Sequence, residues 1–441
     1  MLFSVSSGHP RGHLRPHNRF AVSKYIWILH LKHAKIHNMR TYEKTHPWLK
    51  FEIDLRGASI PFWMSLGEIR SKCEHIAGVP LGKKIADQLY TLYLTRGVQA
   101  TTAIEGNTLT EEQVRKRIEG DMTISPSLAY QGREVDNIIK ACNSVLSDLV
   151  TNKKTEISVD LIKDFNKTVL DGLPLDENVV AGEIRKTSVT VGPYRPPPAE
   201  DCLYLLERLC SSLKTELERT DLFDPISRSV LAAVWAHLYI AWVHPFGDGN
   251  GRTARLVEFM LLLEGGVPAP AAHLLSNHYN RTRSNYYLEL DKASRSGGDI
   301  VPFFQYALQG FVDGLIEQLD EIRGYQHRII WHDFVSNALN AAEGRESAQV
   351  RTRQLELVLA LSERPEEVPQ AEISLLTPKI AKAYATKTQK TLSRDLNFLA
   401  ELGLVEATRT GVRARSEMIR AFLPQKKQRG TDASSASFPR T

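Results

Sequence analysis

Residues 244–255, with the sequence HPFGDGNGRTAR, constrain the fold of this chain more than any other segment. Gly249, Asn250 and Gly251 allow backbone conformations that bulkier residues avoid, so successive N–H groups can point into one concavity. The mostly apolar run 256–263 that follows predicts a buried helix beginning at this loop. The positive N-terminal end of such a helix attracts anions. The segment therefore predicts a loop and a helix that together bind phosphate.

The side chains of the same segment suit phosphate chemistry. His244 is a residue type with an ordinary pKa of about 6.5, so it can accept a proton near neutral pH. Asp248 offers the hard oxygen ligand that Mg²⁺ prefers. Arg252 and Arg255 are spaced to share one face of the expected helix. A glycine-rich turn alone is weak support for a nucleotide site, but these groups together make a coherent one.

The segment resembles the signature of the Fic family, HxFx(D/E)GNGRxxR, and matches it at every defined position. The resemblance implies a mainly α fold in which a Fic-type helical core carries a β-hairpin flap. It also implies a protein adenylyltransferase, which transfers AMP from ATP to a Tyr, Thr or Ser hydroxyl of a target protein. Pyrophosphate would be the other product.

The roles of individual residues follow from the same resemblance. His244 would be the catalytic base that takes the proton from the target hydroxyl. Asp248 would hold the Mg²⁺ that bridges phosphate oxygens of the co-substrate ATP. The loop 249–251 would position the phosphates, while Arg252 would bind the outer phosphates and Arg255 the γ-phosphate.

A second segment, 101–107 with the sequence TTAIEGN, lies far upstream, and we call it the inhibitory segment. It resembles the motif (S/T)xxxE(G/N) of Fic proteins in which a regulatory helix precedes the core. The resemblance implies that Glu105 pairs with a motif arginine, Arg255 being favoured, and occupies the place of the γ-phosphate. Taken alone, Thr101 and Glu105 would fit a helix N-cap followed by a solvated glutamate.

Residues 182–192 are rich in β-branched side chains and bounded by glycines, so they predict a short hairpin. The hairpin resembles the Fic flap, which borders the active site and holds a target segment by strand-like pairing. The next residues, 194–198, predict a stiff extended exit. A lone hairpin could instead simply cover the helices beneath it. The candidates for contacting nucleotide as well as target are Val189, Thr190, Val191 and Gly192.

Tyr286 and Tyr287 lie on a helix-like stretch, where the Fic adenine pocket has aromatic residues. Stacking on a purine and ordinary core packing both fit a tyrosine pair of this kind. Ser294 falls where relatives often carry an asparagine that contacts adenine, and this departure leaves its role open. His237 lies in a run apolar enough to be a buried helix, so we interpret it as a core histidine.

Composition narrows the class of protein. The four cysteines show no CxxC pairing, and together with the lack of an evident signal peptide they favour a reducing cytoplasm. No apolar run approaches the ~20 residues that span a membrane, so we expect no membrane partner. The net charge of +5 does not by itself indicate nucleic acid.

The chain divides into six expected regions. Residues 1–40 are rich in histidine, arginine and lysine; we interpret them as disordered or non-native, with Met39 as the true start, although a targeting arm is an alternative. An N-terminal helical region with the inhibitory helix (41–125), the Fic core (126–330) and a linker (331–349) would follow. A winged helix-turn-helix domain (350–424) and a disordered tail (425–441) would end the chain.

Apolar spacing of three or four predicts most of the helices. The expected helices are 81–93, 111–120, 134–150, 159–170, 202–217, 225–242, 255–264 and one from 300 to beyond 329. Thr110 is the expected N-cap of the second of these.

The C-terminal pattern of three helices (350–361, 378–384 and 388–402) followed by two short strands (403–408 and 415–422) resembles a winged helix. Its polar positions could contact DNA backbone and base edges, or the domain could dock a protein. The candidate positions are Lys387, Gln389, Lys390, Ser393, Arg394 and Asn397 on the third helix, and Arg409, Arg413 and Arg415 on the wing.

Two classes of function therefore remain open from the sequence. One is an adenylyltransferase autoinhibited by Glu105, with ATP, Mg²⁺ and an unidentified target protein as partners. The other is a DNA-binding regulator whose Fic core senses nucleotide without transferring it. Within enzymology, transfer of another nucleotide or removal of AMP are alternatives. Self-modification and a homodimer are compatible with the sequence, which identifies neither the target nor the oligomeric state.

Overall fold

The computed structural model describes residues 40–121, 123–151, 156–342 and 347–419, and the chain divides into two compact units. The first unit contains residues 40–78 and 88–315, and the second contains residues 79–87 and 316–419. The extension expected before residue 40 and the tail expected after residue 425 lie outside the described residues. Each unit is considered by itself.

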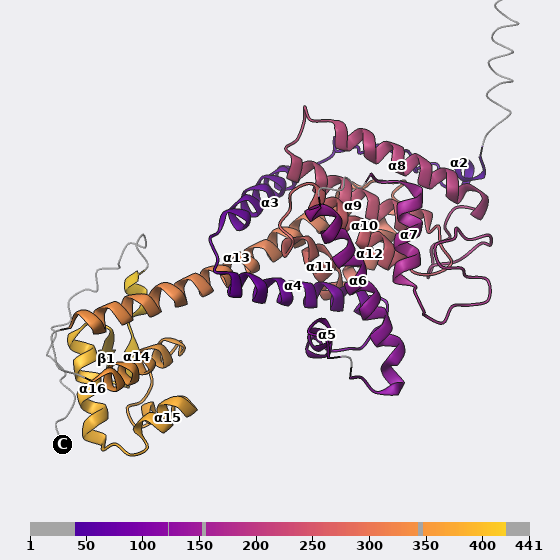
Figure 1. The fold of residues 1–441 in the computed structure, drawn as a ribbon. Coiled ribbons are helices and arrows are strands. Elements are labelled where there is room, and N and C mark those ends of the chain that lie inside the picture. The colour runs from indigo at the N-terminus through magenta and orange to yellow at the C-terminus, as the bar shows by residue number, and fades with distance from the viewer. Residues whose placement is uncertain (1–39, 122, 152–155, 343–346, 420–441) are drawn as a thin grey trace, which may run out of the picture. The chain divides into compact units, whose positions relative to one another are not determined.

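The first unit consists almost entirely of helices, as expected (Figure 1). Its helices are α2 (Thr41–Thr45), α3 (Ile60–Gly78), most of α4 (Lys83–Ala103), α5 (Glu111–Ile118), α6 (Ala129–Val150), α7 (Val159–Val169), α8 (Cys202–Glu218), α9 (Pro225–Val243), α10 (Asn250–Glu264), α11 (Leu274–Arg281), α12 (Arg283–Arg295) and the first part of α13 (Val301–Ala341). Short 3-10 turns lie at Pro126–Leu128, Ala199–Asp201 and Ala271–His273.

Local sequence sets several of these boundaries. Thr110 and Gln113 form a reciprocal capping box at the start of α5, which confirms the expected N-cap. Asp224 caps α9 by accepting a hydrogen bond from the backbone N–H of Ser227, and Pro225 occupies the first turn. The helix after the motif begins at Asn250, five residues earlier than the apolar spacing predicts, because the glycine loop is shorter than expected.

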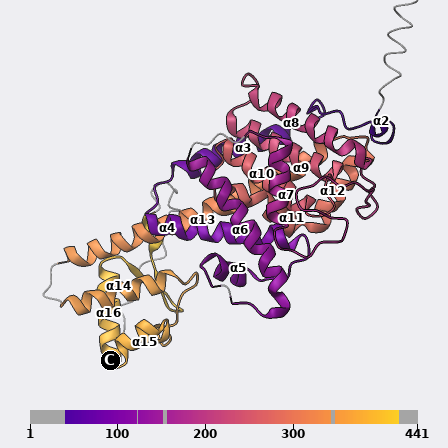
Figure 2. The same cartoon turned by 45° about the vertical axis from the view of Figure 1, so that its right-hand side comes forward.

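Helices α9 and α10 pack side by side at the centre of the first unit, with α3 and α8 against α9 and with α6 and α7 against α10 (Figures 1 and 2). Trp235 and Tyr239 are among the largest side chains that α9 buries. By length and composition α9 could also span a membrane, although 83% of that stretch is buried inside the protein. Its apolar character is explained by its central position.

Residues 182–198, which we call the flap segment, differ from the expected hairpin. Among its described residues there is no regular strand, only isolated bridges that pair Ile184 with Phe246 and Val191 with Tyr194. Gly182 and Gly192 both have positive φ. The side chain of Arg185, not a facing strand, binds backbone carbonyl groups at both ends of the segment. Regular pairing is thereby replaced by one side chain.

The second unit contains the C-terminal elements. They are α14 (Ala348–Ser362), α15 (Pro378–Tyr384), α16 (Gln389–Glu401), β1 (Val405–Ala407), β2 (Val412–Ala414) and 3-10 turns at Ile373–Leu375 and Ser416–Ile419. The strands β1 and β2 pair antiparallel, and Val368 forms a further bridge with Val412. Three helices followed by a hairpin agree with the order of elements expected from the sequence.

Two boundaries in this unit were predicted wrongly. The expected linker 331–349 is helical as far as Ala341, because Trp331, Val335 and Leu339 bury their side chains in the core of the second unit. The expected second strand, 415–422, is also wrong, because β2 lies before it at Val412–Ala414 and Ser416–Ile419 form a 3-10 turn. Thr408 and Gly411 close the tight turn before β2 through a backbone hydrogen bond of 2.8 Å.

A helical glycine tests how tightly the first unit is packed. A Cβ at Gly97 on α4 would collide with the ring of His273, whereas a Cβ at Gly67 on α3 would meet nothing within 4 Å. We therefore expect Gly97→Ala to lower the free energy of unfolding by about 1–3 kcal/mol. Gly67→Ala should raise it by up to about 1 kcal/mol, since alanine favours helix. Urea denaturation of both variants checks this, and equal effects would show that the His273 ring gives way freely.

Candidate active site

His244 occupies an unusual backbone conformation at the end of α9. Its φ of 47° and ψ of 59° lie in the left-handed region, which non-glycine residues rarely adopt. Its backbone N–H donates to the carbonyl of Ile240 and closes the last turn of the helix. The chain can then reverse through Pro245 and enter the glycine loop. The helix end therefore fixes the position of the candidate base.

The loop between α9 and α10 is held by two asparagines. Asn250 accepts a hydrogen bond from the backbone N–H of Phe246 and donates to the carbonyl of the same residue, so its amide holds the loop at both groups of Phe246. Asn166 on α7 donates to the backbone carbonyl of Asp248, and its own carbonyl accepts from the backbone N–H of Gly182. Asn166 thus joins the loop to the start of the flap segment.

Both motif arginines lie inside the protein at the start of α10. Arg252 and Arg255 are 3% and 2% exposed, respectively. Arg252 pairs with the buried carboxylate of Glu134 on α6 at 2.5 Å, and its other terminal nitrogen lies 3.2 Å from Asp248 Oδ1. Both arginines belong to α10, as expected, and Arg252 reaches the carboxylate of the loop residue Asp248.

The inhibitory segment reaches the same point from the end of α4. One carboxylate oxygen of Glu105 lies 2.5 Å from Arg255 Nη2, and the same nitrogen donates to the carbonyl of Thr101. A Cβ at Gly251 would collide with this carboxylate oxygen, so the close approach requires glycine there. A negative group therefore occupies the N-terminal end of α10, where the sequence predicts a bound phosphate.

A second connection runs from the inhibitory segment to the other motif arginine. The side-chain amide of Asn107 donates to Glu134 at 3.0 Å, and Glu134 in turn holds Arg252. Asn107 also accepts from the backbone N–H of Leu109, which fixes the turn after Glu105. The segment is consequently attached to both arginines, directly to one and through a carboxylate to the other.

Burial favours the neutral form of His244. Burial is the main cause that lowers the pKa of His244 to about 4, and the positive charge of Arg185 acts in the same direction. Glu105 and Asp248 oppose this shift. Burial also acts to raise the pKa of Glu105, but the charge and hydrogen bond of Arg255 outweigh it and hold that carboxylate below its usual range. The candidate base is neutral and the inhibitory group is ionised near neutral pH.

The two candidate tyrosines on α12 lie in different environments. Tyr286 is buried, and its hydroxyl lies 2.9 Å from Nε2 of His237, a fully buried core histidine as expected. Tyr287 is 45% exposed, and its hydroxyl lies 3.4 Å from the carbonyl of Ile104 in the inhibitory segment. Of the two rings, that of Tyr287 is therefore the accessible one.

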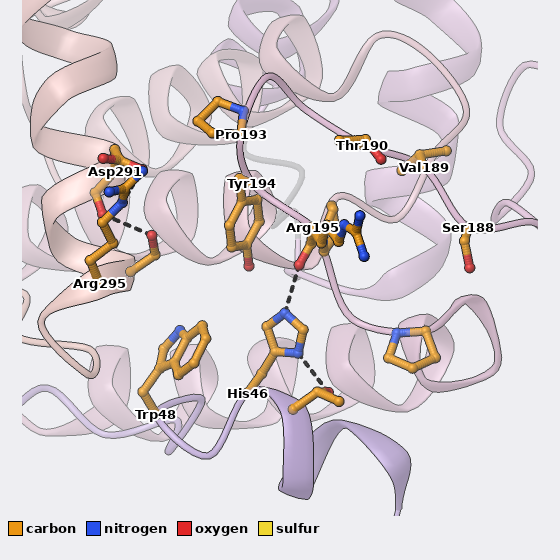
Figure 3. A pocket seen from close by; sticks show the side chains of 14 residues that line it. His46, Trp48, Ser188, Val189, Thr190, Pro193, Tyr194, Arg195, Asp291 and Arg295 are labelled. Carbon is orange, nitrogen blue, oxygen red and sulfur yellow. Dashed lines mark hydrogen bonds and ion pairs between the residues drawn. The ribbon is translucent and has the colours of Figure 1, made fainter.

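The flap segment borders a pocket of about 790 Å³ (Figure 3). Val189 and Thr190 line it from the flap, while Ser294 and Arg295 line it from α12. His46 closes a further side by hydrogen bonding to the backbone carbonyl of Arg195 at 2.8 Å. Val191 and Gly192 are exposed and are not among the residues that line this pocket.

Residues 156–262 match the model of the Fic/DOC family. This stretch of the chain is similar to the Fic domain. This match includes the whole motif 244–255 and the flap segment, but it begins after the inhibitory segment. A solved Fic family protein from Desulfovibrio desulfuricans, 21% identical and with a TM-score of 0.50, covers 80% of this chain and 92% of its own. That likeness supports the fold seen around the Fic domain.

Relatives of known name extend the comparison. Protein adenylyltransferase fic-1 of Caenorhabditis briggsae is 33% identical over 240 residues, which are 54% of this chain and 43% of the relative. Protein adenylyltransferase Fic of Nematostella vectensis is 30% identical over 242 residues, which are 55% of this chain and 52% of the relative. The chain thus spans only about half the length of these relatives, and the similarity concerns the part that includes the Fic domain.

Three polar residues of the site were not singled out from the sequence. Glu134, Asn166 and Arg185 are each buried and bind the motif loop or its arginines. Glu134 falls among apolar positions of α6, and that placement was the only available signal, since a carboxylate is rarely buried without a partner. Asn166 and Arg185 reach the motif loop through backbone groups of Asp248 and His244 far along the chain, which no local pattern indicates.

The neutral state of His244 can be measured directly. We expect its ring protons to titrate near pH 4 in the folded protein, because burial and Arg185 disfavour the charged ring, against about 6.5 in the urea-unfolded chain. Since the unfolded chain binds this proton more strongly, His244 should make the free energy of unfolding rise with pH between these values. NMR titration with His244→Gln for assignment provides the test. Titration near 6.5 in the folded state would contradict it.

Proposed function

We propose that the protein is an adenylyltransferase that transfers AMP from ATP to a hydroxyl side chain of a target protein, and that Glu105 inhibits it. One observation carries the proposal. The carboxylate of Glu105 lies against Gly251 at the start of α10 and binds Arg255, so that an anion already occupies an anion-binding point. The names of the relatives that match the Fic domain support the same activity.

His244 is the proposed base. Because its ring is neutral near pH 7, it can accept a proton from a target hydroxyl as that oxygen attacks the α-phosphorus of ATP. The bond to pyrophosphate breaks as the new bond to oxygen forms, and AMP remains on the target. Arg252 and Arg255 supply positive charge for the phosphates, held within a buried setting where such charge acts strongly.

Asp248 is suited to hold Mg²⁺. Its side chain is 48% exposed at the mouth of the loop, so one carboxylate oxygen can face a bound nucleotide. Among the described residues no group of three or more His, Cys, Asp and Glu could enclose a metal ion. Mg²⁺ often takes one or two carboxylates and obtains its other ligands from phosphates and water, so Asp248 could serve as its one protein ligand. When bound, the ion would neutralise charge on the leaving phosphates.

The inhibition has a simple electrostatic basis in this proposal. Arg255 cannot bind the γ-phosphate while its terminal nitrogen is paired with Glu105. An ATP molecule that enters must displace a carboxylate of the same sign or bind with its outer phosphate misplaced. Misplacement of the reacting groups by about 1 Å is enough to cost on the order of 100-fold in rate.

The flap segment and α12 are the proposed walls of the nucleotide and target sites. Val189 and Thr190 line the pocket beside the flap, and Tyr287 offers an accessible ring for the adenine base. We retain Val191 and Gly192 as exposed contacts for a target segment. The buried ring of Tyr286 would act by packing beneath Tyr287, with ring centroids 5.1 Å apart.

Labelled nucleotides test the activity. Wild type, Glu105→Gly and His244→Ala are incubated with labelled ATP, GTP and UTP, with Mg²⁺ and a bacterial lysate as a source of targets. We expect Glu105→Gly to transfer label from ATP at least about tenfold faster than wild type, because Arg255 becomes available. His244→Ala introduced into Glu105→Gly should abolish transfer while nucleotide binding persists.

Each alternative gives a different result. Label on the protein itself would show self-modification, and preference for GTP or UTP would identify another nucleotide. Loss of AMP from a pre-modified protein would indicate the reverse reaction. Absence of label with both wild type and Glu105→Gly would contradict the proposal and favour the nucleotide-sensing regulator.

A second candidate function, DNA binding, is favoured by the charge at the start of α16. Lys387, Lys390 and Arg394 are exposed there, and the described residues include no ion-pair partner for them. The hairpin is less suited to bind DNA than expected, because Arg413 already forms ion pairs with Glu406, at 2.7 Å, and with Glu417. Ser393 is buried, which removes it from the exposed face. We propose that this helix, not the hairpin, contacts DNA phosphates.

Salt dependence tests DNA binding. The full chain is titrated with a labelled duplex at several salt concentrations, alongside the triple variant K387Q/K390Q/R394Q and the control R56Q/R70Q/K140Q. Loss of three phosphate contacts should reduce the slope of log affinity against log salt by about 1 per contact. The control should keep the wild-type slope. Equal slopes for the two triple variants would exclude α16 as the contact.

A further inference from the structure

Arg185 in the flap segment is a buried cation with an unusual set of partners. The residue is 6% exposed, yet no carboxylate pairs with its guanidinium among the described residues. It binds three backbone carbonyl groups instead, those of His244 at 2.8 Å, Thr187 at 2.8 Å and Pro197 at 2.5 Å. A buried charge normally requires a compensating partner, so this arrangement needs a structural or functional reason.

The three carbonyl groups belong to separate parts of the site. Thr187 precedes the tip of the flap segment, Pro197 follows it, and His244 ends α9. The backbone of Arg185 is attached to the same place, because its N–H donates to the carbonyl of Pro245 at 2.9 Å. One residue therefore fastens both ends of an irregular loop to the turn that carries the candidate base.

The hydrogen bond from Arg185 to His244 is important because His244 has a strained, left-handed backbone conformation. A left-handed backbone at a non-glycine residue costs roughly 1–2 kcal/mol and persists only where the surroundings fix it. The Nε–H of Arg185 donates to the carbonyl oxygen of His244 itself. This bond, together with the N–H of His244 on Ile240, restrains the peptide groups on both sides of its Cα.

We propose that Arg185 is a positioning residue, whose guanidinium sets the flap segment in register with His244 so that a bound target hydroxyl meets the base. This proposal rests on the proposed transferase function for its catalytic consequence, but its structural part stands independently. In this proposal the flap segment holds the target and His244 is the base. The target's hydroxyl meets His244 only if the flap segment and His244 are both held by Arg185.

Arginine suits this task better than lysine. Its planar guanidinium carries five N–H donors in fixed directions, so it can bind three carbonyl groups that lie in different directions. An ammonium group of similar reach has three donors on one nitrogen and must approach all acceptors from a single point. Burial is the largest cause of the lowered pKa of His244, and the permanent charge of Arg185 lowers this pKa further.

Three readouts test the proposal in a Glu105→Gly background, and two of them do not depend on activity. Arg185→Met removes the charge and the donors, and Arg185→Lys keeps the charge but loses the planar arrangement of the donors. Arg56→Met is the control, because the side chain of Arg56 is 90% exposed and forms its ion pair with Asp54, outside the candidate site. The first readout is hydrogen–deuterium exchange across 186–198, with α3 as the internal reference. The second is kcat and KM for transfer to the target.

We expect faster exchange of the flap amides in both Arg185 variants, unchanged exchange in α3 and no change for Arg56→Met. We expect kcat to fall on the order of 100-fold, with ATP affinity kept within about threefold, because a misplaced base costs that much in rate. The third readout is the NMR titration of His244, which should move to higher pH in Arg185→Met because the charge of Arg185 is lost and that of Asp248 remains.

Two results would overturn the proposal. One is flap exchange equal to that of the parent in a folded Arg185→Lys or Arg185→Met protein. The other is a kcat within twofold of the parent. If the Glu105→Gly parent transfers no AMP, the transferase function fails, and the exchange measurement still decides the structural part. If Arg185→Met does not fold, the measurements on Arg185→Lys decide the test.

Discussion

The ion pair between Glu105 and Arg255 is the contact around which the site is arranged. It brings the end of α4 against the start of α10, two elements about 150 residues apart in sequence. Arg255 is almost fully enclosed, so its charge has to be matched inside the protein. Gly251 supplies the space, because no side chain could lie beneath the carboxylate. A glycine expected to cradle phosphate is therefore also what allows the inhibitory group to approach.

Much of the fold could be predicted from the sequence because the helices are strongly periodic. The spacing of apolar residues located α7 and α8 nearly to the residue, and the Thr110 capping box marked the start of α5. Ends were less predictable where tertiary packing extends a helix. The part of α13 after residue 331 is polar enough to suggest a linker, yet Val335 and Leu339 bury it in the second unit.

The candidate site was predictable where neighbouring residues carry the chemistry, and less so where distant residues meet. His244, Asp248 and the two arginines lie in one short motif. Their proximity could therefore be predicted without knowledge of the fold. Arg185 could not be recognised in this way, because its acceptors are backbone carbonyl groups, which every residue possesses. The same holds for the irregular flap, where β-branched residues indicate strand but a side chain has replaced strand pairing.

The attachment of Asn107 to Glu134 bears on how inhibition could be relieved. The turn after Glu105 is anchored by Asn107 on Gln131 and Glu134, whereas the side chain of Glu105 is 31% exposed and has a glycine as its next neighbour. The anchoring contacts do not involve the carboxylate that binds Arg255. An incoming phosphate would thus compete with one rotatable side chain while the backbone stays in place. Relief of the proposed inhibition by such a rotamer change would therefore need no unfolding of α4.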